Sequence, residues 1–488
     1  MSSSGLIISA LALPAFGACL IALTRRSPNV REGITLITGA ALLFVVVQLF
    51  LAVSAGERPE ASLITVVQGI DIAFAVEPLG MLFALVASGL WIVNSIYSIG
   101  YMRGNDEPRQ TQFYVCFAIA IASTMGIAFS KNLFTLFLFY ELLTLSTYPL
   151  VTHKGDENAR RGGRIYLLIL LSTSMLLLLP AIIATWAISG TVEFSVGGIL
   201  AGKADGAVVG ILLALYAFGI GKAALMPVHS WLPNAMVAPT PVSALLHAVA
   251  VVKAGVFSIL KVVVYIFGID FLSSSGQNQW LLYIAGATVI LSSLIAMTKD
   301  NLKARLAYST VSQLSYIVLG AALATSLGIV GGTMHIAMHA AGKITLFFCA
   351  GAIYTAAHKT EISDLSGLGR VMPFTFAAFF IGALSIIGLP PTGGLWSKWY
   401  LALGALEADQ VIIVAVLMLS SLLNIAYLLP IPLKAFFGTP KKKQKTSPEI
   451  KEAPLACLIA IGITSLLCVV LFFFPGPVYD LASMIKLR

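Results

Sequence analysis

The sequence predicts an all-α protein that crosses a membrane many times, and three observations support this fold class. First, 58% of the 488 residues are hydrophobic and only 10% are charged, whereas soluble domains carry about 25% charged residues. Second, apolar runs of about 20 residues, the length of a bilayer-spanning helix, recur along the chain. Third, most basic residues gather in the connections between these runs. A chain of this composition turns most of its surface toward lipid.

The apolar runs predict about fourteen transmembrane helices, numbered here in chain order. Their approximate ranges are 5–23, 33–54, 78–101, 111–129, 131–151, 164–187, 207–227, 240–267, 279–298, 306–325, 328–355, 373–400, 410–437 and 454–475. Residues 62–77 alternate in polarity and predict a small extramembrane hairpin. We expect four parts: 1–110 with helices 1–3 and the hairpin, a five-helix unit over 111–270, a second over 271–437, and a basic loop with the final helix over 438–488.

The basic residues predict the orientation in the membrane. Connections on one side hold twenty of the thirty lysines and arginines, and cytoplasmic loops are typically the basic ones. The other side carries only Arg58, Lys131, Lys203, Lys486 and Arg488. We therefore expect a multi-pass protein of the cell inner (plasma) membrane with both termini extracytoplasmic. The net charge of +9 reflects this topology, so no nucleic-acid partner is expected.

A few ionisable residues remain inside the apolar runs. They are Glu141, Lys222, Lys253, Lys261, Lys343 and Lys398. Because a charge at the bilayer centre costs about 2.5–3.5 kcal/mol on insertion scales, such residues usually mark an ion path. Glu141 is too deep to reach either interface, so we expect it to pair with Lys222, either in gating or as a purely architectural ion pair. Lys261 lies near the end of its run and is expected to extend toward the interface.

Proline and glycine interrupt two of the predicted helices. The segments 219–241 and 388–398 each contain such a break and a lysine. A break frees backbone groups that only a protein- or water-lined interior can satisfy, and broken helices form ion sites in many transporters. A simple re-entrant loop is the alternative. The breaks fall five helices apart, in helices 7 and 12, which predicts two inverted five-helix repeats, helices 4–8 and 9–13.

Helix 11 carries a regular polar stripe. His335, His339 and Lys343 follow at intervals of four residues, so they lie on one helix face about 6 Å apart along the axis. Histidine titrates near neutral pH, which suits proton transfer. A polar packing seam between helices would produce the same pattern. Helix 8 adds His247 and Lys253 to the buried polar set.

Five segments of the sequence resemble a known family. They are FLFYELLTLSTYPLV, GKAALMPVHSWLPNAMVAPTPVSALLHAVAVVKAG, DNLKARLAYSTVSQLSY, HAAGKITLFF and GLPPTGGLWSKW. They are similar to the proton-conducting antiporter family, which includes antiporter-like subunits of respiratory complex I, membrane hydrogenase subunits and Mrp-type cation/proton antiporters. The resemblance covers roughly residues 60 to 440. The chain length and Lys398 make the sequence most similar to the D-type component of Mrp antiporters.

The resemblance implies fourteen helices around a water-filled polar axis and a set of proton-translocating residues. By motif these are Glu141, Lys222, Lys253, His335, His339 and Lys398. We expect His229, His247 and Lys343 to form a supporting polar path. Glu77 stands where relatives often have aspartate, a departure that we expect to have little consequence for the proton pathway.

The sequence therefore predicts a proton-translocating subunit of a multi-subunit monovalent cation (Na⁺)/H⁺ antiporter, a transporter more than an enzyme. Its expected partners are other membrane subunits, the lipid bilayer, protons and, in the assembly, Na⁺; no cofactor or metal is expected. A single buried carboxylate provides few hard oxygen ligands for sodium, so we expect sodium to be handled elsewhere. The alternatives are an antiporter-like subunit of a complex I or membrane-bound hydrogenase-type redox complex, and the membrane subunit of an inorganic-carbon uptake complex.

Overall fold

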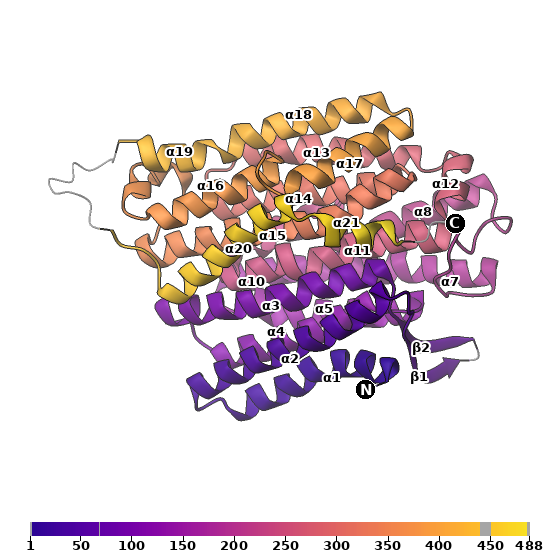
Figure 1. The fold of residues 1–488 in the computed structure, drawn as a ribbon, viewed down its shortest axis with the longest axis horizontal. Coiled ribbons are helices and arrows are strands. Elements are labelled where there is room, and N and C mark those ends of the chain that lie inside the picture. Colours follow the sequence, from indigo (N-terminus) through magenta and orange to yellow (C-terminus); the bar gives the residue numbers. More distant parts are fainter. Residues whose placement is uncertain (1, 68, 440–449, 486–488) are drawn as a thin grey trace.

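The computed structural model describes residues 2–67, 69–439 and 450–485. Several basic residues that contribute to the predicted orientation lie outside the described residues: Lys441, Lys442, Lys443, Lys445, Lys486 and Arg488. Most long helices run side by side along the longest axis of the molecule (Figure 1).

The first half of the chain forms the lower layers of Figure 1 and then enters its centre. Its long helices are α1 (Ser3–Leu23), α2 (Pro28–Ser54), α3 (Pro78–Gly104), α4 (Gln110–Ala128), α5 (Leu133–Val151), α6 (Glu157–Thr173), α7 (Leu179–Ser189), α8 (Gly206–Gly219) and α11 (Val251–Val262). The short turns between them are η1 (Ser174–Leu178), η2 (Gly221–Ala223), η3 (Val228–Ser230), α9 (Trp231–Asn234), η4 (Ala235–Val237), α10 (Thr240–Ala244), η5 (Leu245–Val249) and η6 (Val263–Phe267).

The second half packs against the first through its central helices. Its elements are α12 (Ile269–Ser275), α13 (Gln279–Thr298), α14 (Leu302–Ala322), α15 (Ser326–Ala357), η7 (Ile362–Asp364), η8 (Leu368–Arg370), α16 (Pro373–Ile387), α17 (Gly394–Glu407), α18 (Val411–Leu428), α19 (Pro430–Phe437), α20 (Leu455–Phe473) and α21 (Gly476–Ser483). Helix α20 returns to lie against α3, α15 and α16, so the end of the described chain joins the two halves.

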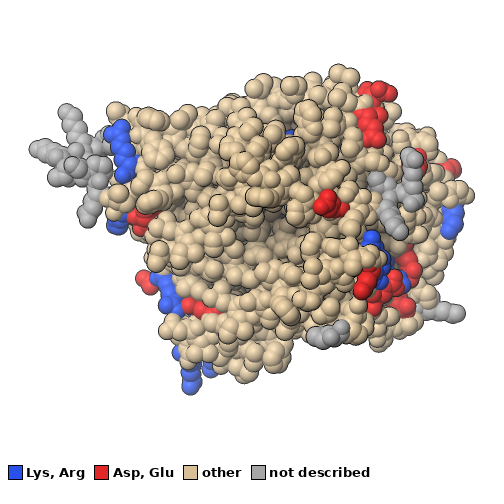
Figure 2. Space-filling view, viewed as in Figure 1, with Lys and Arg blue, Asp and Glu red and all other residues tan. Residues whose placement is uncertain are grey.

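Within the described residues, eleven helices are long and apolar enough to cross a membrane by length and composition. Figure 2 shows the matching surface: charged side chains gather toward the two ends of the molecule, and the broad region between them is almost free of charge. The prediction of an all-α polytopic membrane protein is confirmed. The count of fourteen crossings stays a prediction, because the remaining predicted spans fall on the shorter or less apolar helices α8, α14 and α16–α17.

A two-stranded hairpin marks one end of the molecule. Strands β1 (Glu60–Val67) and β2 (Ile70–Ala75) are antiparallel and overlap the region 62–77 where the sequence predicts a hairpin. Its second strand joins the connection between α4 and α5, where Ala75 N donates to Phe129 O at 2.7 Å. We call this end the hairpin face. The opposite end, where the α1–α2, α3–α4 and α5–α6 connections lie, is called the basic face (Figure 1).

Two helical segments form the centre of the bundle. The most apolar windows of Thr240–Phe267 and Ser326–Ala357 are completely buried, whereas those of α1, α20 and several others are only one third buried. A helix surrounded by protein can carry polar side chains that a lipid-facing helix cannot. The predicted lysine and histidine positions of helices 8 and 11 lie on these two central segments.

Candidate functional site

The first predicted break lies at the end of α8. This helix ends at Gly219, and the chain passes through the short turns η2 to η4 before α10 begins. The freed backbone groups are bonded inside the protein: Trp231 Nε1 donates to Gly221 O at 2.9 Å, and Lys222 N donates to the Tyr140 hydroxyl at 3.0 Å. These bonds hold the break open without exposing its backbone to lipid, as a membrane interior requires.

The break positions Lys222 against α5. Its Nζ donates to Tyr140 O at 2.8 Å and to Thr144 Oγ1 at 2.6 Å, and it lies 3.1 Å from the centre of the Tyr140 ring. A carbonyl, a hydroxyl and an aromatic face are the neutral ligands that stabilise a desolvated ammonium. Lys222 is fully buried, so this cage replaces its hydration.

Glu141 lies next to this cage without closing it. Its two carboxylate oxygens are buried and act on Lys222 electrostatically, but they lie beyond ion-pair distance of the lysine. Neither carboxylate oxygen has a hydrogen-bond partner among the described residues. The predicted direct Glu141–Lys222 pair is therefore wrong for this conformation. The physical reason is that the Lys222 ammonium already donates to oxygens of Tyr140 and Thr144, which lie on the same helix as Glu141.

A glycine contact joins the Lys222 break to the central helix α11. A Cβ added at Gly255 would lie 2.3 Å from both Lys222 C and Ala223 N. Only glycine lets two backbones approach this closely. Gly255 follows Lys253 by two residues, so the contact brings the Lys222 turn against the helix that carries the next buried lysine.

A row of polar side chains runs from α11 through α15 to α17. Lys253 Nζ lies 2.6 Å from His339 Nδ1. The His339 and His335 rings follow with centroids 5.8 Å apart, and His335 Nδ1 lies 2.8 Å from Ser397 Oγ. Ser397 directly precedes Lys398. These residues come from three helices and are buried, so side chains far apart in the sequence form one file.

The second break positions Lys398 at the far end of this file. Helix α16 ends at Ile387, and Lys398 Nζ donates to its freed carbonyl at 2.9 Å and to Ser421 Oγ at 3.3 Å. The ammonium lies 4.8 Å from the centre of the Tyr316 ring, which stacks on His335 at 5.5 Å. Both broken segments thus supply a lysine caged by a carbonyl, a hydroxyl and a tyrosine.

The supporting residues occupy different positions. Lys343 Nζ donates to Ser309 Oγ at 2.7 Å, on α14. His247 lies in the π-helical turn η5, buried against Phe347, and neither ring nitrogen has a hydrogen-bond partner among the described residues. His229 is only partly buried and contacts the Tyr308 ring at 6.1 Å. The structure brings Lys343 and His247 near the central file and leaves His229 toward its periphery.

Lys261 extends toward the hairpin face, as expected, but its ammonium is buried there instead of reaching solvent. Its side chain is 1% exposed, its Nζ lies 2.6 Å from Glu77 Oε1, and it donates to Ser130 O at 2.6 Å. Glu77 therefore neutralises this buried lysine. Phe194 covers the ammonium from the side at 4.4 Å. The hairpin and the α4–α5 connection bring these partners together. Glu77 and Lys261 are far apart in the sequence, so the pair could not be predicted from spacing.

Sequence reasoning also missed neutral partners of the charged groups. Tyr140, Thr144, Tyr316 and Ser397 line the file or its cages. The spacing of Tyr140 and Thr144, one turn apart beside Glu141, is the signal that could have found the first cage. Within the described ranges, no group of three His, Cys, Asp or Glu side chains is arranged to hold a metal ion.

Comparison with known proteins relates this geometry to a family. Residues 130–424 match the family model described as NADH:quinone oxidoreductase/Mrp antiporter, TM. The NADH-quinone oxidoreductase subunit N of Desulforudis audaxviator is 33% identical over 83% of this chain and 82% of its own length. The A component of the Na⁺/H⁺ antiporter of Alkalihalophilus pseudofirmus is 31% identical over 84% of this chain but only 53% of its own length.

Other relatives extend the range of assemblies. Hydrogenase-4 component B of Escherichia coli is 30% identical over 82% of this chain and 62% of its own length, so the chain spans only about half to two thirds of several longer relatives. In fold, the chain matches one from the Mrp complex of Dietzia sp. with a TM-score of 0.89 at 22% identity, over 99% of this chain and 97% of that one. By its matched residues and its relatives, this chain belongs to the NADH:quinone oxidoreductase/Mrp antiporter family of transmembrane subunits.

Proposed function

We propose that this chain is the proton-translocating subunit of a multi-subunit monovalent cation (Na⁺)/H⁺ antiporter, corresponding to the D-type component of Mrp antiporters. The observation that carries the proposal is the buried file Lys253–His339–His335–Ser397–Lys398. Bases of this kind, in a row and shielded from lipid, can hand a proton from one nitrogen to the next. Membership of the NADH:quinone oxidoreductase/Mrp antiporter family supports the coarser part of this proposal, an antiporter-like membrane subunit.

The proposed path has an order. A proton is loaded at Lys222 or Lys253, passes through His339 and His335, and reaches Lys398 at the second break. Lys253 and His339 are close enough to share one proton directly, whereas the 5.8 Å between the two histidine rings calls for a bridging water or a ring rotation. Each transfer leaves a neutral donor and a protonated acceptor, so the charge moves with the proton.

Glu141 is the proposed gate. When its carboxylate approaches Lys222, it favours the charged ammonium, and when it withdraws it favours the neutral amine. In the structure Lys222 is held by neutral ligands while Glu141 stands nearby without a hydrogen-bond partner among the described residues. A small shift of α5 or of the η2 turn would exchange these partners.

Proton transport by the intact assembly tests this proposal. We expect Lys222→Met and His335→Gln to abolish transport in vesicles that contain the assembly, with normal expression and subunit composition. Lys203→Met is the matched control, because Lys203 is exposed in a connection. Full transport by both site variants would contradict the proposal. Separately, we expect the path to carry protons alone, so radiolabelled sodium uptake through the isolated chain would contradict that part.

A second candidate is an antiporter-like subunit of a redox-driven proton pump. It is favoured by the NADH-quinone oxidoreductase relative of Desulforudis audaxviator, which this chain matches over most of its length. The same buried residues would serve either assembly. Purification of the native complex distinguishes them: small membrane subunits without redox centres support the antiporter, whereas co-purifying iron–sulfur or hydrogenase subunits support the redox pump. A co-purifying carbonic-anhydrase-like protein would instead support inorganic-carbon uptake.

A further inference from the structure

The basic face contains a cavity of about 170 Å³. Lys154 and Lys359 from two connections and Lys303 from the start of α14 line it, together with Tyr101, Thr240 and Asn301. This volume is large enough for several water molecules. Thr240 begins α10, seven residues before His247, which places the buried histidine about 10 Å further along the helix axis. The cavity therefore lies between the basic face and the buried His247.

Beside this cavity lies a pair of titratable groups that the proposed path does not use. Glu107 is in the α3–α4 connection and His153 follows α5. Their side chains are only 8% and 1% exposed, and Glu107 Oε2 lies 3.9 Å from His153 Nε2. This nitrogen has no hydrogen-bond partner among the described residues. Lys154 and Lys303, both lining the cavity, act electrostatically on Glu107.

The surroundings of this pair favour the neutral form of each group. Burial raises the pKa of Glu107, against the opposing effect of Lys154 and Lys303. Burial, then Arg109, lowers the pKa of His153 to about 4. His153 is therefore neutral at neutral pH, and the Glu107–His153 contact is not an ion pair under those conditions. A carboxyl of raised pKa beside a neutral imidazole can accept a proton and pass it on.

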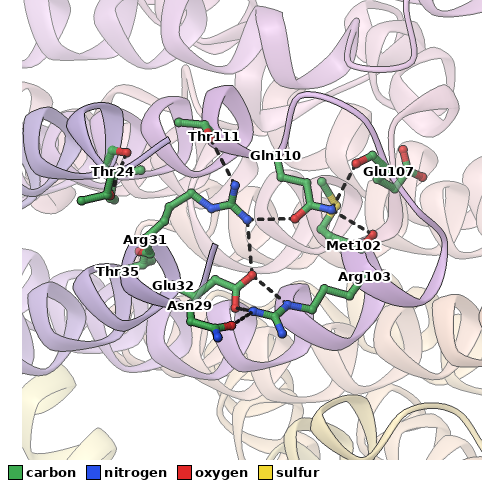
Figure 3. A network of polar contacts seen from close by, with 11 residues as sticks. Thr24, Asn29, Arg31, Glu32, Thr35, Met102, Arg103, Glu107, Gln110 and Thr111 are labelled. Atoms are coloured by element: carbon green, nitrogen blue, oxygen red, sulfur yellow. Dashed lines mark hydrogen bonds and ion pairs between the residues drawn. The ribbon is translucent and has the colours of Figure 1, made fainter. Parts of the chain in front are cut away.

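A polar network fixes the turn that carries Glu107. Gln110 Nε2 donates to Glu107 O at 3.2 Å, while Gln110 Oε1 accepts from Arg31 Nη2 at 2.9 Å. Arg31 in turn pairs with Glu32 at 3.3 Å. Figure 3 shows these side chains arranged between α2 and the α3–α4 connection.

Backbone strain lies on both sides of the same residue. Asp106 and Arg109 have φ values of 49° and 52°, a left-handed conformation that is unusual for arginine. Strain of this kind tends to persist where a side chain must be held in one position. The hydrogen bonds of Gln110 therefore stabilise a strained backbone conformation in the α3–α4 connection. Glu107 lies between the two strained residues.

We propose that Glu107 is the residue that takes up protons at the basic face, and that His153 positions it. This inference rests on the proposed proton path. A proton from bulk water binds a Glu107 carboxylate oxygen, moves through the cavity toward His247, and leaves the carboxylate ionised for the next cycle. The exposed Lys154 and Lys359 repel metal cations from the cavity, so that Glu107 collects protons without binding sodium.

Several charged and titratable groups face the Glu107–His153 pair. Glu107 is faced by His153 and Lys154 from the α5–α6 connection, by Lys303 from α14 and by Tyr101 from α3; Arg109 and Lys154 face His153. At low pH bulk protons are plentiful and can reach the cavity without a collecting group. At high pH they are scarce, and uptake then depends on the carboxyl.

The test measures proton transport by the full assembly in proteoliposomes while the pH at the basic face is varied. We expect Glu107→Gln to lose transport several-fold at about pH 8 and to retain most of it at about pH 6, and Glu107→Asp to recover part of the loss, because only a titratable group can collect protons. His153→Gln should show a weaker shift in the same direction. Unchanged transport at high pH, or an equal loss at every pH, would overturn the inference.

Two further variants separate this inference from the proposed function. Glu157→Gln removes an exposed carboxylate at the start of α6 on the same face, and its pH profile should match the unaltered protein. Lys222→Met should lose transport at every pH. If Lys222→Met transports normally, the proposed path itself fails, whereas a normal Glu107→Gln profile beside an inactive Lys222→Met overturns only the inference about Glu107. Thermal stability of each variant excludes a folding defect.

Discussion

Lys253 Nζ lies 2.6 Å from His339 Nδ1, and both side chains are at most 1% exposed. At this distance the two nitrogens share a hydrogen bond, so one of them must donate a proton and the other must accept it. Two positive charges this close in a buried site would repel strongly. The pair therefore holds one charge at most, and the position of that charge can move between the two helices α11 and α15 without moving either backbone.

The Lys253–His339 contact predicts a large loss of transport in Lys253→Met. Methionine fills a similar volume without a proton to give, so the helix stays packed while the transfer stops. We expect a decrease of about 10²-fold or more, the scale for removing a positioned proton donor. Proton uptake into vesicles measures it, with Lys203→Met as the exposed-lysine control. If Lys253→Met retains more than about a tenth of the control's transport rate, Lys253 does not transfer the proton directly.

The close approach at Gly255 predicts that Gly255→Ala impairs the site without altering any ionisable group. The added Cβ would overlap Lys222 C and Ala223 N, so the η2 turn must move and its lysine cage opens. Overpacking of this kind costs about 1–3 kcal/mol. Thermal unfolding and transport should both fall.

Gly462→Ala is the matched control for the Gly255 substitution. A Cβ at Gly462 meets nothing within 4 Å, and alanine favours a helix over glycine by about 1 kcal/mol. Stability of this variant should stay the same or rise. Equal behaviour of the two alanine variants would mean that the η2 turn can shift without affecting the lysine cage.

The Lys261–Glu77 pair predicts that the two residues stabilise the hairpin face together. Removing one member of a buried ion pair costs about 3–5 kcal/mol because the other charge is left unpaired. The Glu77 side chain is 17% exposed and that of Lys261 1%, so the lower end applies. We expect Glu77→Gln and Lys261→Met each to lower the unfolding temperature. The double variant should be more stable than the sum of the single losses implies; strictly additive losses would show that the pair is not coupled.

The low pKa of His153 predicts a pH dependence of stability outside the membrane. Its folded pKa of about 4 lies below the ordinary value of about 6.5, so the unfolded chain binds its proton first. The free energy of unfolding is therefore highest above about pH 6.5. It decreases by about 3 kcal/mol in all as the pH falls toward 4. His153→Gln should flatten this part of the profile of unfolding temperature against pH. An unchanged slope in the variant would assign the dependence to another group.

The sequence alone determined the class of protein and the identity of the buried ionisable residues. Both follow from local physics: a run of about 20 apolar residues spans a bilayer, and a charge inside such a run is costly wherever the neighbouring helices lie. The breaks near Lys222 and Lys398 were also predictable, because proline and glycine interrupt a helix through their own backbones. The i, i+4 spacing of His335 and His339 places them on one face in any α-helix.

Which of these residues meet depends on the tertiary packing. Lys222 is bound by Tyr140 and Thr144, while Glu141 on the same helix remains outside ion-pair distance. Lys261 finds Glu77 and Ser130 across the hairpin face. Such contacts depend on the rotation and depth of one helix against another, which are set by close approaches such as that of Gly255 to the Lys222 turn. The sequence of a single helix does not specify these contacts, because its buried charges could be neutralised by any neighbour that packing brings within reach.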